Sequence, residues 1–474
     1  MMKYLFILLL TALFLISCND NSRKVLTVGK PNIIFILADD LGYADIEPFG
    51  QKIIQTPELK RLAAEGMIFT DHYSGNTICA PSRYSLMTGL HPGNAYVRGN
   101  RQSKPTGQLP LPEGTTTVST LLKSAGYNTA MIGKWALGNV GNSGDPVNFG
   151  WDLSYGYNDQ ILAHNYYPEF LIRNGKKEYL QNEVKYLSKE RYHKGLGSYS
   201  TVKKEYSHDL MVNEALQFIR NQKEDPFFFY LPLLIPHSNP EAPSGERLEV
   251  PDFGIYEDSV SWNKETKGYA AMISRLDKDV GRIVDLLIDL NLEKNTIVIF
   301  TSDNGAEPGE VFTDYFNSNG PFRGGKRDMY EGGIRAPMIA WWPGTIEAGK
   351  VNNHISAFWD FLPTACDLAG IEIPENIDGI SFLPALLGES QQTHKYLYWE
   401  FPSRGFKTAV RKGKWKAVQA RFDQELELYN LDTDPGEENN VASEYPVIVE
   451  EMKDIINEAH TPSALFPRPD ELKE

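Results

Sequence analysis

The stretch NIIFILADD, residues 32–40, is a nearly continuous run of large apolar side chains that ends in two aspartates. Pro31 precedes it and marks where it begins. A run of this length without polar alternation is typical of a strand buried on both faces, as in a parallel sheet covered by helices. The sequence therefore predicts an α/β fold in which residues 32–38 form a buried strand.

Asp39 and Asp40 follow this strand directly. At the carboxyl ends of parallel strands a ligand site is expected. Two adjacent buried carboxylates repel each other and need a cation or strong hydrogen-bond donors, and hard oxygen ligands suit calcium or magnesium. A helix N-cap followed by a surface acid would give the same two residues, so this pair alone leaves both interpretations open.

A second pair of oxygen ligands follows another apolar run. Residues 295–300 are expected to form a buried strand, and TSDNG, residues 301–305, comes directly after it. The ends of two strands in one parallel sheet can converge on the same edge. Together the two pairs would supply four side-chain ligands to one divalent cation, which favours a metal site made of Asp39, Asp40, Asp303 and Asn304.

The remaining pattern alternates strands and helices. Apolar runs predict further strands at 128–132, 227–231 and 337–342. Helical spacing of apolar residues predicts helices over 56–66, 118–125, 206–220 and 269–287. Residues 238–266 are rich in Pro, Glu and Gly and are expected to form a loop. This alternation predicts one large, mostly parallel sheet flanked by helices.

The composition shifts near Gly388. Beyond it, strand-like runs at hairpin spacing predict a small antiparallel sheet made of residues 397–400, 408–411, 414–418 and 427–429. A helix over 446–459 would pack on this sheet. We therefore expect a large domain over residues 31–388 and a C-terminal subdomain over 389–474.

The chain has 474 residues and a formal net charge of −15. A protein this acidic is not expected to bind nucleic acid through bulk electrostatics. If its substrate is anionic, the attraction must come from a local basic pocket that acts against the overall field.

The N-terminus is typical of an export signal. Lys3 is followed by an apolar run over 4–16 and then by Ser17 and Cys18, and the run is too short to span a bilayer. The segment LISC resembles a bacterial lipobox. This predicts a signal peptide over 1–18, a lipid on Cys18, a tether over 19–30 and a membrane-anchored lipoprotein in the periplasm or on the cell surface. An ordinary cleaved signal is the alternative.

Two other cysteines remain. Cys366 lies in an apolar pattern and is expected to be a small buried side chain. Cys79 stands in ICAPSRYSLMTG, residues 78–89, a polar, basic and turn-like context broken by Pro81 and Gly89. Such a cysteine is a nucleophile, a metal ligand or an inert buried thiol, and its neighbours alone leave the three roles open.

The run C-x-P-S-R with Thr-Gly downstream resembles the signature of the type I (formylglycine-dependent) sulfatases, and the chain looks like a bacterial arylsulfatase-A-like carbohydrate sulfatase. The resemblance implies that a formylglycine-generating maturation enzyme converts Cys79 to formylglycine (3-oxoalanine), whose hydrate attacks the sulfate. It also implies an alkaline-phosphatase-like sandwich, with a large mostly parallel central sheet flanked by helices and a small C-terminal antiparallel sheet with a helix.

Other segments match this family in the expected order, namely GKWALG at 133–138, Pro-His at 236–237, SDNG at 302–305 and GGK at 324–326. The resemblance implies a Ca²⁺ site, or alternatively Mg²⁺, formed by the four oxygen ligands and completed by the modified Cys79. It assigns the binding and reaction of the sulfate to Arg83, Lys134, His237 and Lys326. One position departs from the family, because Ala136 stands where histidine is usual.

Three more residues are expected in loops that contact the substrate, namely Arg98, Asn100 and His164. His164 is also a candidate to replace the histidine missing at position 136. A simple pocket or packing role is the favoured interpretation of His164.

The resulting hypothesis is a sulfuric ester hydrolase that removes sulfate from a sulfated carbohydrate during glycan degradation. Two alternatives stay open. The first is a phosphodiesterase or phosphonate monoester hydrolase of the alkaline phosphatase superfamily. The second is a non-catalytic glycan-binding lipoprotein, which Ala136 makes worth considering.

Overall fold

The computed structural model describes residues 29–101, 103, 108–187, 197–222, 224–309 and 314–473. The predicted signal peptide, the lipid site at Cys18 and nearly all of the predicted tether over 19–30 lie outside these residues. In the described part of the chain, no helix combines the length and apolar character needed to cross a membrane.

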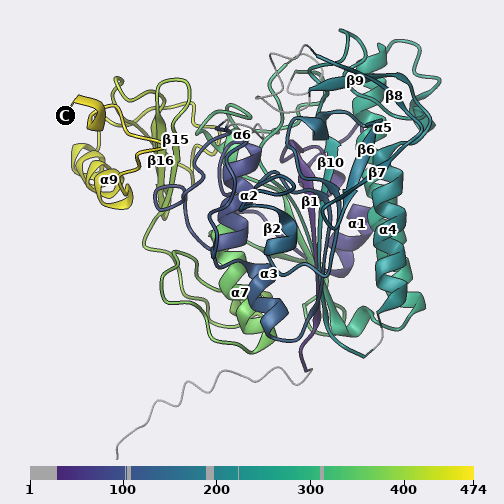
Figure 1. Ribbon diagram of the computed structural model, residues 1–474. Coiled ribbons are helices and arrows are strands. Elements are labelled where there is room, and N and C mark those ends of the chain that lie inside the picture. Colours follow the sequence, from purple (N-terminus) through teal and green to yellow (C-terminus); the bar gives the residue numbers. More distant parts are fainter. Residues whose placement is uncertain are drawn as a thin grey trace, which may run out of the picture.

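A sheet of ten strands forms the centre of the protein, in the order β13-β2-β12-β11-β1-β10-β4-β5-β6-β7 (Figure 1). The apolar run that ends in the two aspartates forms β1 (Asn32–Asp39), which lies between β10 (Phe227–Pro236) and β11 (Thr296–Ser302). Both neighbours run parallel to it, and β4 (Asn128–Lys134) continues the parallel part beyond β10. The predicted α/β class and the four predicted parallel strands are confirmed.

Toward both edges the sheet becomes mixed. β5 (Leu153–Tyr157) is parallel to β4, whereas β6 (Phe170–Arg173) and β7 (Lys176–Tyr179) are antiparallel. At the other edge lie β12 (Met338–Trp341), β2 (Met67–Phe69) and β13 (Lys350–Asn352). Two small two-stranded sheets pair β3 with β14 and β8 with β9, over His72–Tyr73, Ser356–Ala357, Glu183–Tyr186 and Ser198–Val202.

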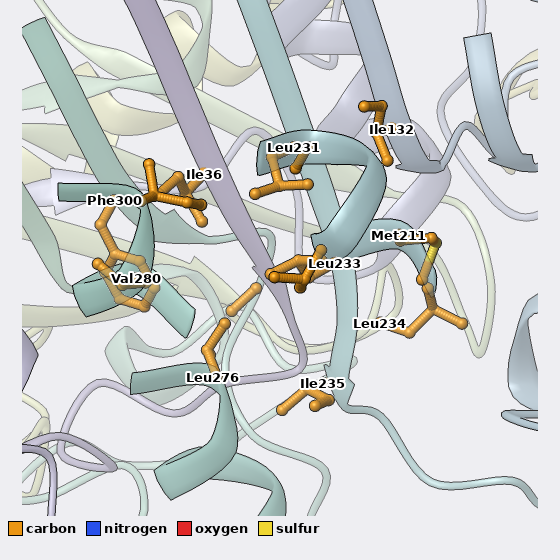
Figure 2. Packing of buried hydrophobic residues seen from close by; sticks show 14 of the residues in the cluster. Ile36, Ile132, Met211, Leu231, Leu233, Leu234, Ile235, Leu276, Val280 and Phe300 are labelled. Atoms are coloured by element: carbon orange, nitrogen blue, oxygen red, sulfur yellow. The ribbon is translucent and has the colours of Figure 1, made fainter. Parts of the chain in front are cut away.

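Side chains of β1 alternate between two cores because successive residues of a strand point to opposite faces. Ile34 and Ile36 pack on the face covered by α1 (Pro57–Glu65), α4 (Ser207–Asn221) and α5 (Lys264–Asp289). Figure 2 shows Ile36 and its neighbours on this face. Phe35 and Leu37 pack on the opposite face with α2 (Cys79–Thr88), α3 (Val118–Ser124) and α7 (Phe361–Ala369). The near-continuous apolar sequence of β1 therefore reflects burial on both sides.

The C-terminal part forms an antiparallel sheet beside this body (Figure 1). Its strands are β15 (Leu397–Phe401), β16 (Lys407–Lys412), β17 (Trp415–Gln419) and β18 (Glu427–Asn430), and α9 (Pro446–Ala459) packs on it. The small sheet and its helix confirm the predicted C-terminal unit. The domain boundary at residue 388, which follows the short helix α8 (Leu383–Leu386), stays a prediction.

Buried charges join the small sheet to the main body. Lys416 of β17 donates to Glu331 at 2.8 Å and to Glu437 at 3.1 Å, and all three side chains are fully buried. Glu331 begins the short helix α6 (Glu331–Ile334) and also accepts from Arg335. Burial opposes ionisation of Glu331, yet Lys416 holds its pKa at about 2. Separating these ion pairs would leave buried charges without a partner, which costs free energy. The ion pair between Lys416 and Glu331 therefore holds the small sheet against α6.

The segment around Cys79 is helical, which corrects the turn-like interpretation from the sequence. Residues 79–88 form α2, and every residue of that helix is buried. Pro81 is compatible with the helix because it lies in the first turn, where backbone N–H groups have no partner inside the helix. Gly89 ends the helix in the left-handed conformation, with φ of 73°. Cys366 is buried in α7, as predicted.

His72 in β3 makes the free energy of unfolding depend on pH. Its Nδ1 lies 2.9 Å from the Ser356 hydroxyl, and burial lowers its pKa to about 3 although the Asp360 carboxylate opposes the shift. Since the pKa in the unfolded chain is higher, at about 6.5, the unfolded state takes up the proton first. The stability that neutral His72 contributes is therefore present above that value and is lost as the pH falls.

We expect His72→Asn to flatten this dependence. Between pH 7 and pH 5, the free energy of unfolding of the variant should fall by about 2 kcal/mol less than that of the wild type, as measured by urea denaturation at each pH. His394→Asn is the control, because Asp360 raises the pKa of His394 against the effect of burial, so its removal should change the slope in the opposite sense. Identical pH profiles for the wild type and the His72 variant would contradict the prediction.

Candidate active site

The two acidic strand ends meet at one edge of the central sheet. Asp39 is the last residue of β1, and Asp303 follows β11. The backbone N–H of Asp40 donates to Asp303 Oδ1 at 3.1 Å, and Asn304 Nδ2 donates to Asp40 Oδ1 at 2.7 Å. The four side chains are at most 4% exposed. The convergence predicted from the sequence is therefore present in the structure.

Three cations from other segments neutralise these acids. Lys134, the last residue of β4, donates to Asp39 at 2.6 Å, and Lys326 donates to Asp40 at 2.5 Å. Arg83 of α2 donates two hydrogen bonds to Asp303 Oδ2, from Nε at 3.1 Å and from a terminal nitrogen at 2.8 Å. Burial opposes ionisation of Asp39, but Lys134 and the other cations keep its pKa well below the ordinary value.

Three carboxylates face three cations here, so their formal charges cancel. A divalent cation that binds the three carboxylates would leave the ammonium groups of Lys134 and Lys326 without their anionic partners. A divalent cation and a negatively charged ester, which offset each other, can enter together. The arrangement is therefore suited to an anionic substrate that binds next to a metal ion.

Glycines allow this close assembly. A Cβ on Gly133, the residue before Lys134, would lie 2.0 Å from the carbonyl oxygen of Pro232, and its φ is +138°. A Cβ on Gly305, the residue after Asn304, would lie 1.8 Å from the carbonyl oxygen of Gly332. No side chain fits either gap, so these glycines bring the neighbouring backbones together at the strand ends.

Cys79 starts α2 and points at the acidic cluster. Its Sγ lies 3.2 Å from Asp39 Oδ1 and the residue is 1% exposed. Burial and the nearby carboxylate raise the pKa of this thiol well above its ordinary value. Because the thiolate is the nucleophilic form of cysteine, an unmodified Cys79 is a poor nucleophile at neutral pH.

The donor set fits a hard divalent cation. Asp39, Asp40, Cys79 and His237 offer ligand atoms that lie within 4.8 Å of one another. Asn304 Oδ1 is buried and has no hydrogen-bond partner, which is costly for an amide oxygen unless a ligand satisfies it. Burial and Asp39 raise the pKa of Asp303 to about 7 even though Arg83 opposes the shift. Several acidic oxygens and one unsatisfied amide oxygen are ligands that Ca²⁺ or Mg²⁺ prefers.

His237 lies directly after β10 and joins the same cluster. Its Nδ1 donates to the Ser238 carbonyl oxygen at 2.6 Å, so Nε2 is the acceptor that Lys326 approaches at 3.2 Å. Burial and the ammonium of Lys326 lower the pKa of His237 well below its ordinary value. The imidazole of His164 stacks on His237 with 4.7 Å between ring centroids, and its Nδ1 lies 2.9 Å from Glu241.

A pocket of about 630 Å³ opens over Cys79. Of the residues singled out in the sequence, five line it, namely Cys79, Asn100, His164, His237 and Lys326. Asn100 also accepts a hydrogen bond from the backbone N–H of Ala80 in the first turn of α2. The five residues come from segments far apart in the sequence, and the fold brings them to one cavity.

Arg98 does not join them, which corrects its assignment to the substrate loops. Its guanidinium donates to Glu400 at 2.8 Å and to the Ala95 carbonyl oxygen at 2.7 Å, and the residue is only 3% exposed. A buried arginine of this kind is a structural link. It links the loop that contains Arg98 to β15 through Glu400.

Ala136 leaves space where a larger side chain would stand. It is buried, has φ of 61° and lines a separate cavity of about 140 Å³ together with Asn100, Gln108 and Gln160. His164 lines the larger pocket and not this cavity. The structure therefore places His164 beside His237 and not in the space at Ala136.

Several residues in or beside the pocket were not identified from the sequence. Glu241 and Glu307 pair with His164 and Lys326, and Arg247 and Arg404 line the cavity. Each lies in an irregular segment without periodicity, and its partner is distant in the chain. Nothing in the local pattern distinguishes these side chains from ordinary surface charges.

Comparison with known proteins identifies the family. Residues 31–371 match the sulfatase family, and residues 322–461 match the family of N-sulphoglucosamine sulphohydrolase C-terminal regions. The chain belongs to the sulfatase family. The match covers both acidic strand ends, Cys79, Lys134, His237 and Lys326, so this sulfatase is a sulfuric ester hydrolase.

Relatives of this sulfatase include both animal and bacterial enzymes. N-acetylgalactosamine-6-sulfatase of Canis lupus familiaris is 33% identical over 417 residues, which cover 82% of this chain and 71% of the canine protein. N-acetylgalactosamine-6-O-sulfatase of Bacteroides thetaiotaomicron is 28% identical, and the match covers 94% of this chain and 97% of the bacterial protein.

Among solved structures, Ps i-CgsB in complex with k-i-k-neocarrahexaose superposes on this sulfatase with a TM-score of 0.76. The two chains are 28% identical, and the match covers 94% of this chain and 96% of the other. The predicted alkaline-phosphatase-like sandwich is thereby confirmed for the sulfatase described here.

Proposed function

We propose that this sulfatase removes sulfate from a sulfated saccharide, with Cys79 converted to formylglycine and with Ca²⁺ held by Asp39, Asp40, Asp303 and Asn304. The observation that carries the proposal is the meeting of these four oxygen ligands with Cys79 and two lysines in one buried cluster. Relatives that act on N-acetylgalactosamine 6-sulfate and a relative that binds a neocarrahexaose support a carbohydrate substrate.

When bound, the cation would withdraw charge from the sulfate oxygens, and the hydrated formylglycine would supply the attacking hydroxyl. The residues of the chain do the rest. The ammonium groups of Lys134 and Lys326 bind the sulfate oxygens in a dry site where charge-assisted hydrogen bonds are strong. Arg83 holds Asp303 in place through two hydrogen bonds. Lys326 and His237, which lie 3.2 Å apart, hold the proton that the leaving oxygen needs.

We also propose that the protein is exported and anchored to a membrane through a lipid on Cys18, in the periplasm or at the cell surface. The N-terminal sequence pattern supports this location. Metabolic labelling with a fatty acid should mark the wild type and leave Cys18→Ser unlabelled. Equal labelling of both proteins would contradict the anchor.

The experiment that tests the reaction has two steps. Mass analysis of the peptide that spans Cys79 should show formylglycine in place of cysteine after expression with a maturation enzyme. The modified protein should then release sulfate from sulfated monosaccharides and oligosaccharides with a higher kcat/KM than it shows for matched phosphate monoesters, phosphodiesters and phosphonate esters. Faster cleavage of a phosphate or phosphonate ester, or saccharide binding without turnover by the modified protein, would overturn the proposal.

A further inference from the structure

Four arginine or lysine side chains line the pocket over Cys79, although the whole chain carries a net charge of −15. They are Arg247, Lys326, Arg327 and Arg404. Cations gathered in the cleft of an acidic protein create a local positive potential that attracts anions. Which of them are free to bind a ligand depends on their present partners.

Lys326 and Arg327 are already engaged. Lys326 donates to Asp40 at 2.5 Å and lies 3.3 Å from Glu307, and Arg327 forms an ion pair with Glu307. The proposed function assigns Lys326 to the sulfate that is cleaved. Neither side chain is therefore left over for another part of the substrate.

Arg247 and Arg404 differ from this pair. Both are exposed, and within the part of the chain that the structure describes neither guanidinium has a hydrogen-bond or ion-pair partner. Glu265 lies beside Arg247, but its carboxylate accepts from the backbone N–H groups of Gly245 and Arg247. Arg404 stands in the turn between β15 and β16 with φ of 58°, a conformation that arginine rarely adopts.

The pocket is also larger than one sulfate group requires. Its volume of about 630 Å³ lies within the range of sites that enclose a whole drug-sized ligand. Cys79 lines the pocket from the start of α2. Arg247 lines it from the loop before α5, and Arg404 lines it from the C-terminal sheet. The two arginines therefore belong to wall segments other than the helix that carries Cys79.

We infer that Arg247 and Arg404 bind a second anionic group of the substrate, so that this sulfatase prefers saccharides with at least one sulfate or carboxylate besides the sulfate it removes. The inference rests on the proposed function. Guanidinium groups recognise both sulfate and carboxylate through paired hydrogen bonds. The two arginines determine specificity and take no part in the bond that breaks.

The test compares three disaccharides that share one cleavable sulfate. The first has no other charge, the second has an additional sulfate and the third has an additional carboxylate. Wild-type enzyme with modified Cys79 should cleave the doubly charged compounds with a kcat/KM about 10 to 100 times higher than that of the singly charged one. Whichever doubly charged compound shows the larger preference identifies the second group.

Arg247→Gln and Arg404→Gln should each reduce this preference about tenfold, and the double variant should abolish it. Cleavage of the singly charged compound should stay within about twofold of wild type in all three variants. Arg220→Gln is the matched control, because Arg220 is also an exposed arginine but lies on α4 and does not line the pocket. It should change neither rate.

Binding provides a readout that does not depend on turnover. In the Cys79→Ala background, the Kd for the doubly charged disaccharides should rise about tenfold with each arginine removed, and added salt should weaken the binding. If wild type releases no sulfate from any compound, the proposed function fails, and this binding measurement still decides the inference. Equal kcat/KM values for singly and doubly charged substrates, or equal losses on both in the variants, would overturn the inference.

Discussion

Replacing Cys79 with alanine is expected to abolish sulfate release while leaving the fold intact. The side chain sits 3.2 Å from Asp39 Oδ1, at the centre of the acidic and basic groups, and alanine can supply no nucleophile. We expect kcat to fall by at least about 10,000-fold, the order seen when an enzyme loses its attacking group. The loss of one buried sulfur should cost about 1 kcal/mol of unfolding free energy, so the melting temperature should change little.

The matched control is Cys366→Ala. Cys366 is also buried and belongs to α7, on the face of the sheet that packs against α2, and no atom of it lines the pocket. This variant should lose a similar amount of stability and keep its turnover. Activity of Cys79→Ala within about tenfold of wild type would contradict the role given to Cys79.

A divalent cation is expected to stabilise the protein, and Asp40→Asn should remove most of that effect together with turnover. The Asp40 carboxylate accepts hydrogen bonds from Asn304 and Lys326, and its backbone N–H donates to Asp303 Oδ1. The substitution therefore takes one formal charge from the centre of the ligand set. A ligand that binds only the folded state at about 100 times its Kd adds about 2.7 kcal/mol to the unfolding free energy. The measurement is the melting temperature of chelator-treated protein before and after Ca²⁺ or Mg²⁺ is added.

Asp277→Asn serves as the control for this experiment. Asp277 is a buried acid on α5 that accepts hydrogen bonds from the backbone of Glu58 and Leu59, and it belongs neither to the proposed ligand set nor to the pocket lining. Its variant should be less stable but should respond to the cation as the wild type does. A cation-induced shift of equal size in Asp40→Asn and wild type would exclude the proposed ligand set.

The sequence predicted best those elements whose apolar composition follows directly from their burial. β1, β10, β11 and β4 are apolar throughout because both faces of the parallel sheet are covered. For the same reason the polar residues that follow these strands stood out as candidate ligands. The convergence of Asp39 and Asp40 with Asp303 and Asn304 could be predicted because parallel strands end at one edge.

Other features could not be predicted because they depend on partners far along the chain. The helix at Cys79–Thr88 is buried on all sides by other elements, so its sequence has no apolar stripe, and its Pro81 and Gly89 predict a turn. The strands β7 and β8 expose many of their side chains and resemble loops in composition. The sequence around Arg98 predicts a substrate loop because nothing near it indicates Glu400, which lies 302 positions away.

The outer wall of the pocket comes partly from the hairpin turn that carries Ser403 and Arg404, whereas the reacting groups stand on strand ends of the parallel sheet. Changes in that turn leave the hydrogen-bond ladder of the parallel sheet untouched. If Arg404 determines specificity as inferred, substitutions at exposed positions of this turn are expected to change substrate preference while the groups that break the ester bond keep their positions. An exchange of residues 402–406 between two related sulfatases would then transfer selectivity without rebuilding the machinery that breaks the ester bond.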